Sequence, residues 1–361
     1  MSRSPISAKS PTHVTLGGRS LLAFVGTDYL GLSAHEKVLE ACREGLERYG
    51  LSASASRVTS GTYEAHVQLE EALAEFLGLE SALVLPSGDL ANQALLESME
   101  GELDRILIDA DSHTSLVRAA RANGAPRHDY GPGDPTRLLA LCDRFRGERL
   151  AILTDAVFPA KGRLAPIAHL LRYAPPKALV VVDDSHGMGV LDKRGRGTLA
   201  AFGTPSSQVV VTFSLAKSLG AFGGALVGPA QVIETVRRRS EVYQGGTALP
   251  PAVALAARTA LGILEAEPER VRRLHRNIRL LHEIAASHGR IPQGSFLPVW
   301  NIEFPDPAEG QRWHTELMRL GIFVPFSHYP SHPGGALRIS VCSEHSREHM
   351  AELYEALASL R

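Results

Sequence analysis

The chain has 361 residues, 44% of them hydrophobic and 21% charged, and 38 Lys and Arg against 39 Asp and Glu give a formal net charge of −1. This length predicts one large domain plus a smaller one. The balanced charge provides no basic surface for nucleic acid or an anionic membrane, so we expect small-molecule or protein partners.

The cysteines and the apolar runs indicate the cellular compartment that we expect for the protein. Cys42, Cys142 and Cys342 are odd in number and widely spaced, which favours neither a disulfide framework nor a metal site of the zinc type. The first ten residues lack the apolar run of a signal peptide, and no later run approaches the roughly 20 apolar residues of a membrane span. We therefore expect a cytoplasmic protein.

Apolar and helical segments alternate through the first two thirds of the chain. Apolar runs predict strands at 81–85, 105–109, 150–154, 178–183 and 208–213. Helical spacing predicts helices at 114–122, 136–146 and 167–173. The strand runs are continuous, as in strands covered on both faces. This order predicts an α/β fold with a doubly wound, mostly parallel sheet, whose ligands bind beyond the carboxyl ends of the strands.

The pattern changes near residue 252, from where it is helical as far as 288. Strands at 297–304, 321–324 and 336–340 and a helix at 344–360 then predict a small α+β domain. We expect three parts along the chain: an N-terminal arm at 1–36 that packs with the small domain, a large cofactor-binding domain at 37–263, and a small C-terminal domain at 264–361.

Two segments point to the chemistry. The apolar run Val180-Val-Val ends at Asp183, with His186 three residues on, and a second run ends in Ser214-Leu-Ala-Lys217, followed by glycines. A lysine can hold the aldehyde of pyridoxal 5′-phosphate (PLP) as a Schiff base, and a buried carboxylate can keep the pyridine nitrogen protonated. A lone lysine is usually a solvated surface group, and Asp183 alone could be a simple cap. Together they favour PLP.

Further candidates lie where strands meet helices. Ser87-Gly88-Asp89 follows a strand and begins a helix, whose free amides suit a phosphate, although a plain N-cap by Ser87 explains the pattern equally simply. His113 also precedes a helix, where it could stack on the pyridine ring or only cap the helix. Arg338 could bind the carboxylate of an amino acid or form a structural salt bridge.

The order and spacing of these motifs resemble the α-oxoamine synthase family of PLP-dependent enzymes. The stretches that carry the resemblance are Asp28-Tyr-Leu-Gly-Leu32, Ser56-Arg57 with Gly61, His66-x-x-Leu69-Glu70, Ser87-Gly88 with Asn92, His113-x-Ser115-Leu116, Asp183-x-x-His186-Gly, the Lys217 segment, Thr247-x-x-Pro250-Pro251 and Leu337-Arg-Ile-Ser340. The resemblance implies PLP-dependent fold type I, as in aspartate aminotransferase, with a large and a small domain.

The resemblance also implies roles around the cofactor ring. Lys217 would carry the aldimine and shuttle protons. Asp183 would pair with the pyridine nitrogen, His186 would contact the phenolic oxygen, and His113 would stack on the ring. Asp155, which stands where the family has a glutamate, would belong to the same cofactor site.

The remaining roles concern the phosphate, the substrate and the partner chain. The phosphate would be held by Ser87, Gly88, Asp89 and Ser214. Thr247 would reach the phosphate of a neighbouring subunit, which implies a homodimer with composite sites. Arg338 would bind the carboxylate of a small amino acid, glycine, alanine or serine. The implied reaction condenses this amino acid with an acyl-CoA and releases carbon dioxide, leaving an α-amino ketone.

Several positions depart from the family pattern. Asp89 replaces an aromatic residue, Asp155-Ala156 replaces Glu-Gly, and Pro159-Ala-Lys-Gly-Arg163 replaces Ser-Met-Asp-Gly-Asp. These departures cluster at expected substrate contacts, so a PLP-dependent aminotransferase or an aldol-type lyase remains an alternative. A non-catalytic partner subunit is the third hypothesis, but such subunits commonly lose the lysine that this chain keeps.

Overall fold

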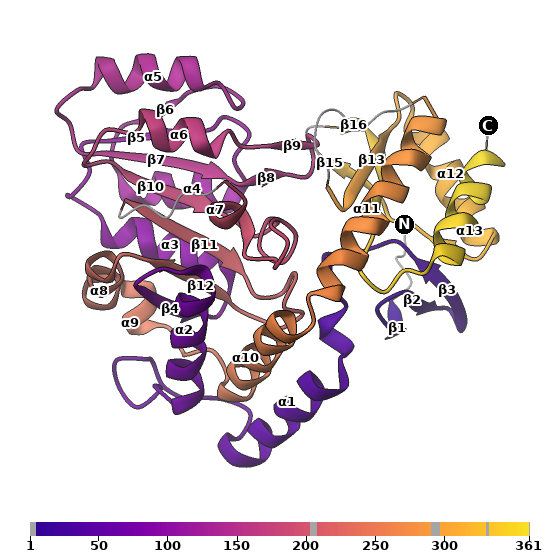
Figure 1. Cartoon of the computed structure of the whole chain (residues 1–361), viewed down its shortest axis with the longest axis horizontal. Helices are drawn as coiled ribbons and strands as arrows, with labels where there is room; N and C mark the ends of the chain where they lie inside the picture. The colour runs from indigo at the N-terminus through magenta and orange to yellow at the C-terminus, as the bar shows by residue number, and fades with distance from the viewer. Residues whose placement is uncertain (1–4, 203–207, 290–296, 330–331, 361) are drawn as a thin grey trace. The chain divides into compact units, whose positions relative to one another are not determined.

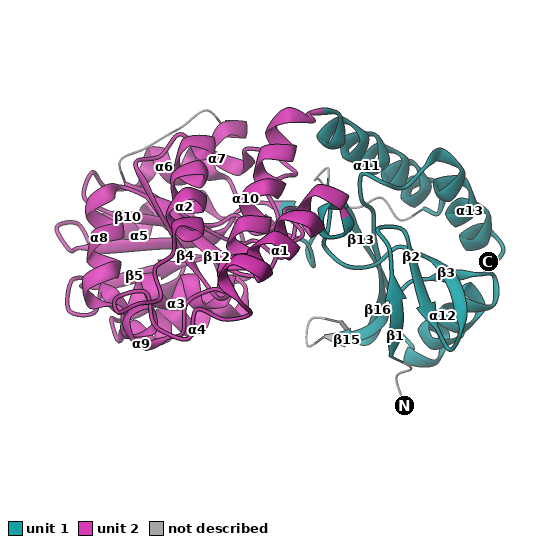
Figure 2. Cartoon of the chain, turned by 90° about the horizontal axis from the view of Figure 1, so that it is seen from below, with its two compact units in different colours: residues 1–34, 159–163, 269–361 teal, residues 35–158, 164–268 magenta. Residues whose placement is uncertain are grey.

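The structure is a computed structural model, and it describes residues 5–202, 208–289, 297–329 and 332–360. Contacts between Cα atoms divide the chain into two compact units, shown separately coloured in Figure 2. Unit 1 consists of residues 1–34, 159–163 and 269–361, and unit 2 consists of residues 35–158 and 164–268. Unit 1 therefore combines both ends of the chain with a short internal segment.

Unit 2 is built around a seven-stranded sheet with the order β4-β12-β11-β10-β7-β5-β6 (Figure 1). Its strands are β4 (Ser81–Leu85), β5 (Arg105–Ile108), β6 (Arg127–Asp129), β7 (Leu150–Asp155), β10 (Leu179–Asp183), β11 (Val209–Ser214) and β12 (Gly224–Gly228). Only β12 runs antiparallel to its neighbours. The mostly parallel sheet expected from the sequence is confirmed, and all five predicted strands belong to it.

Helices and one short hairpin complete unit 2. The helices are α1 (Glu36–Tyr49), α2 (Glu64–Leu77), α3 (Gly88–Ser98), α4 (Thr114–Asn123), α5 (Pro135–Arg144), α6 (Ile167–Tyr173), α7 (Gly197–Phe202), α8 (Ala230–Arg239), α9 (Glu241–Gly245) and α10 (Pro251–Ala266). The hairpin strands are β8 (Val157–Phe158) and β9 (Arg163–Leu164). Apolar side chains of α3, α4 and α8 join alternate strand residues in one buried cluster on one face of the sheet. The strand residues between them, such as Val84, Leu107 and Ile152, are buried as well, which explains the continuous apolar runs.

Unit 1 contains two smaller sheets. One has the order β1-β2-β3-β14 and the other β13-β16-β15. Their strands are β1 (Ile6–Lys9), β2 (His13–Leu16), β3 (Arg19–Ala23), β13 (Val299–Glu303), β14 (Ile322–Phe323), β15 (Phe326–Tyr329) and β16 (His332–Ser340). The helices are η1 (Leu32–Ala34), α11 (Glu269–Ser287), α12 (Pro307–Arg319) and α13 (Arg347–Ala358).

The helical pattern expected between 252 and 288 is confirmed, and the structure divides it into two helices, α10 and α11. The break falls at Glu267 and Pro268, between the end of α10 and the start of α11. A proline disfavours helical geometry in the residue before it and lacks the amide that would continue the helix. The break coincides with the boundary between the two units.

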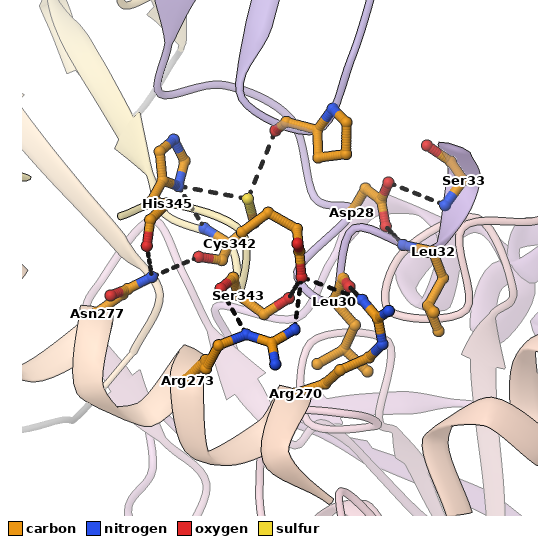
Figure 3. A network of polar contacts seen from close by, with 12 residues as sticks. Asp28, Leu30, Leu32, Ser33, Arg270, Arg273, Asn277, Cys342, Ser343 and His345 are labelled. Carbon is orange, nitrogen blue, oxygen red and sulfur yellow. Dashed lines mark hydrogen bonds and ion pairs between the residues drawn. The ribbon is translucent and has the colours of Figure 1, made fainter. Parts of the chain in front are cut away.

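A polar network holds the N-terminal residues within unit 1 (Figure 3). The Asp28 carboxylate accepts hydrogen bonds from the amides of Leu32 at 3.0 Å and Ser33 at 3.1 Å. Arg270 of α11 donates to the Leu30 carbonyl at 3.2 Å and pairs with Glu344 at 3.0 Å. Because these bonds satisfy the backbone of residues 28–33, the turn is held in one conformation.

Among the residues that the structure describes, no helix combines the length and the apolar character needed to cross a bilayer.

A close helix contact in unit 2 yields a stability prediction. A Cβ atom on Gly45 of α1 would lie 2.6 Å from the Ala252 Cα of α10, so Gly45→Ala forces the helices apart and should cost about 1–3 kcal/mol of unfolding free energy. Gly262→Ala on α10 is the control, because nothing lies within 4 Å of the added Cβ. Its expected effect is a gain of up to about 1 kcal/mol. Urea denaturation followed by circular dichroism measures both, and equal stability of the two variants would contradict the contact.

Candidate active site

The carboxyl ends of the parallel strands bring two acidic side chains together. β10 ends at Asp183 and β7 ends at Asp155, and these two residues are paired in register. On its other side Asp183 pairs in register with Thr212 of β11. Asp183 and Asp155 are both only 8% exposed. This edge of the sheet is where α/β proteins bind ligands, so it is the candidate site.

Asp183 is held by neutral hydrogen-bond donors. Its Oδ2 accepts from Asn92 Nδ2 at 2.8 Å, and its Oδ1 accepts from the Ser185 amide at 3.1 Å. The Thr212 hydroxyl donates to Asn92 Oδ1 at 2.6 Å, which orients the Asn92 amide toward the carboxylate. A buried carboxylate held only by neutral donors gains further stability from a cation. The site therefore fits a protonated ring nitrogen beside Asp183.

Asp155 adds a second acidic group to the same edge. Its two oxygens accept from the His113 amide at 3.3 and 3.1 Å. Burial raises the pKa of Asp155 well above its ordinary value and the neighbouring Asp183 charge raises it further, while the His113 amide and the Lys217 charge oppose this. Burial and the neighbouring Asp183 side chain therefore favour the protonated form of Asp155.

His113 is the N-cap of α4. Its Nδ1 lies 2.8 Å from the Ser115 hydroxyl and accepts from the Ser115 amide at 3.3 Å. Partial burial lowers its pKa; the charges of Asp183 and Asp89 oppose this, and that of Lys217 adds to it. His113 therefore caps α4, which is one of the two roles considered for it from the sequence. The bond from its amide to Asp155 also joins His113 to the acidic pair at the strand ends.

The Ser87–Gly88 turn lies against the end of β11. Ser87 is the N-cap of α3, and its hydroxyl accepts from the Leu90 amide at 3.2 Å. A Cβ atom on Gly88 would lie 3.2 Å from the Cα and Cβ of Ser214. A Cβ atom on Gly224 would overlap the Ser87–Gly88 backbone. The missing side chains at Gly88 and Gly224 thus let the start of α3 approach Ser214, and the amides of this helix start suit a phosphate.

The Asp89 side chain is not suited to bind a phosphate, because its carboxylate is paired with Arg118. Arg118 of α4 donates to both of its oxygens at 2.7 Å. This ion pair is exposed to solvent and compensates the negative charge beside the helix start. The odd acidic residue in the Ser-Gly-Asp turn is therefore explained by Arg118, and only its backbone amide is suited to a phosphate.

The segment after Asp183 contains a residue that the sequence analysis missed. Asp184 is fully buried and accepts hydrogen bonds from the Thr198 amide at 2.8 Å and from the Thr198 hydroxyl. Burial raises the pKa of Asp184 to about 7, which the bonds from Thr198 oppose. The available signal was a second acid directly after the strand end. His186, in the same segment, and Lys217, after β11, are each half-buried.

Two further predicted residues, Arg338 and Thr247, have contacts with other residues. Arg338 belongs to unit 1, on β16, opposite Asn301 of β13. Its side chain bonds the hydroxyl of the buried Tyr29; burial raises the pKa of Tyr29, and Arg338 opposes this. Tyr29 lies in the Asp28–Leu32 motif, but its contact with Arg338 was not anticipated. Thr247 is exposed on unit 2, where it forms an isolated bridge with Ser56.

Comparisons with known proteins agree with this geometry. The family model described as aminotransferase class I and II matches residues 23–357. The 8-amino-7-oxononanoate synthase of Methylococcus capsulatus is 37% identical, covering 98% of this chain and 92% of that one. The enzyme of the same name from Thioalkalivibrio sulfidiphilus is 34% identical, covering 99% and 92%.

Solved structures give the same result. Serine palmitoyltransferase from S. paucimobilis, with a bound PLP–myriocin aldimine, matches with a TM-score of 0.93 at 26% identity and covers 99% of this chain and 92% of that one. An 8-amino-7-oxononanoate synthase from Francisella tularensis matches with a TM-score of 0.80 at 25% identity, covering 94% and 97%.

The buried Asp184 predicts a pH dependence of stability. Its pKa is raised, so between about pH 4 and 7 the folded chain binds a proton that the unfolded chain releases. This contribution is full below about pH 4 and is lost as the pH rises through 7. Asp184→Asn should therefore reduce the fall in urea midpoint between pH 5 and about pH 8, although the fall due to Asp155 remains.

Asp192→Asn provides the control for this measurement. Burial opposes a low pKa at Asp192, but bonds from the Arg194 amide and the Arg196 side chain lower it overall. Its stabilising contribution is therefore present above the pKa of the unfolded chain and is lost on acidification. This pH dependence is opposite to that of Asp184. An Asp184→Asn variant with the same midpoint profile as the parent chain would contradict the assignment.

Proposed function

The chain belongs to the aminotransferase class I and II family, and we propose that it is an α-oxoamine synthase that condenses a small amino acid with an acyl-CoA, with decarboxylation, to give an α-amino ketone. Its similarity to 8-amino-7-oxononanoate synthases over nearly the whole chain supports this proposal. The observation that carries the proposal is the buried Asp183 carboxylate, held by neutral donors at the carboxyl edge of the sheet and within the same group of charges as Lys217.

Four side chains would surround the cofactor ring. PLP, when bound, supplies an electron-accepting ring that stabilises negative charge at the α-carbon of the amino acid. Asp183 would keep the ring nitrogen protonated, and Lys217 would bind the aldehyde carbon through Nζ. His113 would lie on the ring face, and His186 would contact the phenolic oxygen.

The phosphate would lie at the start of α3. The backbone amides of Gly88 and Asp89 and the hydroxyls of Ser87 and Ser214 are the donors available there. The Arg118–Asp89 pair supports this assignment, because it compensates the carboxylate charge beside a dianion. The N-terminal end of the helix adds a favourable electrostatic contribution.

Proton movement would fall to Lys217, and Asp155 and Arg338 would have positioning and binding roles. An amine released from the aldehyde carbon can take the α-proton of the amino acid and later return it. Asp155 has a strongly raised pKa and bonds the His113 amide, so it would keep the His113 segment in place without adding a second negative charge. Arg338 would bind the amino-acid carboxylate, with Tyr29 supporting its guanidinium.

A spectroscopic and chemical test addresses the reaction directly. The purified chain loaded with PLP should absorb in the visible range, change its spectrum with glycine, alanine or serine, and release free coenzyme A only when that amino acid and an acyl-CoA are both present. Lys217→Ala should lose at least about 10²- to 10⁴-fold of the rate, the usual size of an acid–base contribution. Lys177→Ala, at an exposed lysine, is the control.

The same experiment distinguishes the alternatives. Turnover that requires a keto acid and releases no coenzyme A would identify an aminotransferase, and cleavage of a β-hydroxy amino acid without thioester would identify an aldol-type lyase. A chain that binds no PLP and responds to no amino acid would contradict the proposal.

A homodimer with composite sites is the proposed assembly, in the cytoplasm. Large apolar side chains are exposed on unit 2, among them Leu51 at 80%, Val58 at 52% and Phe222 at 58%. Phe222 follows Lys217 by five residues, and Thr247 is exposed on the same unit. Exposed apolar groups of this size favour association, and a second copy of the chain would cover them and bring its Thr247 to the phosphate site.

The dimer leads to a mutational prediction. The double variant Leu51→Glu/Val58→Glu adds buried charges to the proposed interface and should sediment as a monomer with weakened PLP retention. Leu320→Glu, at an exposed leucine of unit 1, should leave the dimer unchanged. Sedimentation velocity and absorbance after dialysis measure both properties. A dimeric double variant would show that the interface lies elsewhere.

A further inference from the structure

Two hydrogen bonds join the segment that carries His186 to the segment that carries Lys217. The Ser214 amide donates to the Ser185 hydroxyl at 3.0 Å, and the Ser218 hydroxyl donates to the Met188 carbonyl at 2.6 Å. Ser185 and Met188 enclose His186 in the sequence, and Ser214 and Ser218 enclose Lys217. The two segments are thus hydrogen-bonded to each other both before and after His186 and Lys217 in the sequence.

The bond from Ser218 to Met188 is protected from water. Ser218 is 2% exposed and Met188 is 3% exposed. A hydrogen bond between buried groups is not replaced by water when one partner is removed, because the other group is left without a donor. Loss of the Ser218 hydroxyl would therefore leave the buried Met188 carbonyl without this donor and would loosen the contact between the two segments.

The segment after Asp183 is itself anchored, so the bond from Ser218 is made to a fixed point. The Asp184 carbonyl accepts from the amides of Gly187 at 3.0 Å and Met188 at 2.9 Å. The Asp184 carboxylate binds Thr198 at the far end of the segment. A Cβ atom on Gly187 or Gly197 would overlap this carboxylate, so the backbone closes tightly around it.

The segment with Lys217 has less support of its own. It is a turn in which the Gly220 amide donates to the Lys217 carbonyl at 2.9 Å and the Ala221 amide donates to the Leu215 carbonyl at 3.1 Å. These bonds fix the backbone of the turn. They do not fix its distance from Asp183 and His186, and a lysine side chain has large rotational freedom. The β10–β11 pairing sets the distance as far as Ser214, and beyond Ser214 the bond from Ser218 is a further contact between the two segments.

We propose that Ser218 is a positioning residue, whose bond to the Met188 carbonyl sets where the Lys217 amine lies relative to Asp183 and His186. The inference rests on the proposed function of Lys217 as the residue that binds the cofactor. Ser218 touches neither the ring nor the substrate in this role. It acts through the backbone of Lys217. The hydrogen bond from the Ser214 amide to the Ser185 hydroxyl is the second contact between the same two segments.

The first test uses the chain without cofactor. Ser218→Ala should speed hydrogen–deuterium exchange in the peptide that spans residues 186–195, because the segment loses its contact with the Lys217 turn. The expected increase is about fivefold, the usual value of one buried hydrogen bond. Ser98→Ala is the matched control: Ser98 is fully buried, and its hydroxyl donates to the Leu95 carbonyl at 2.7 Å within α3.

The second test uses the PLP-loaded chain without substrate. The visible band of the lysine–cofactor linkage should titrate with pH, and its midpoint depends on the distance of the lysine nitrogen from the Asp183 charge. Ser218→Ala should shift this midpoint by about half a unit or more and lower kcat about fivefold at unchanged KM for the amino acid. Ser98→Ala should leave the midpoint and kcat at the parent values.

The outcomes separate the two proposals. A parent chain that binds no PLP would contradict the proposed function, while exchange in the 186–195 peptide still tests the contact of Ser218. If PLP binds and Ser218→Ala shows the same pH midpoint of the visible band and the same exchange rate in the 186–195 peptide as Ser98→Ala, then Ser218 has only a structural role and the inference is wrong. Ser185→Ala, which removes the second contact, should shift the midpoint in the same direction as Ser218→Ala.

Discussion

The site depends on one electrostatic constraint, which is that Asp183 carries a carboxylate into the buried edge of the sheet. Desolvation of such a group is costly unless donors or a cation compensate it. The chain supplies Asn92, oriented by Thr212, and the amide of Ser185. These donors are neutral, and we propose that a protonated ring nitrogen of the cofactor completes the compensation. The function of the fold and the stability of its centre thus depend on the same group.

Sheet topology then gathers the other groups around this carboxylate. Parallel strands end at one edge, so the residues that follow β4, β7, β10 and β11 are neighbours although they are far apart in the chain. The antiparallel β12 contributes its first residue, Gly224, to this edge, where any side chain would overlap the Ser87–Gly88 turn. Small residues are therefore required as much as the functional side chains, because the helix start must approach Ser214 closely.

Unit 1 shows a related use of buried polar contacts. Arg270 and Arg273 both bind Glu344, and this network also holds the turn at residues 28–33 (Figure 3). The same turn contains Tyr29, whose hydroxyl bonds Arg338. The N-terminal residues thus support the guanidinium that we propose for substrate binding. Truncating the chain before residue 33 would remove this support.

The sequence alone determined the five predicted strands and the cofactor class, because buried parallel strands leave continuous apolar runs and PLP requires a lysine and an acid. It did not separate α10 from α11, anticipate β12, or identify Asp184 and Tyr29 as contributors. Those depend on residues distant in the sequence: Thr198 binds Asp184, Arg338 binds Tyr29, and Arg118 compensates Asp89. Only the tertiary structure decides such partners, since the energy of a buried polar group depends on what meets it in space.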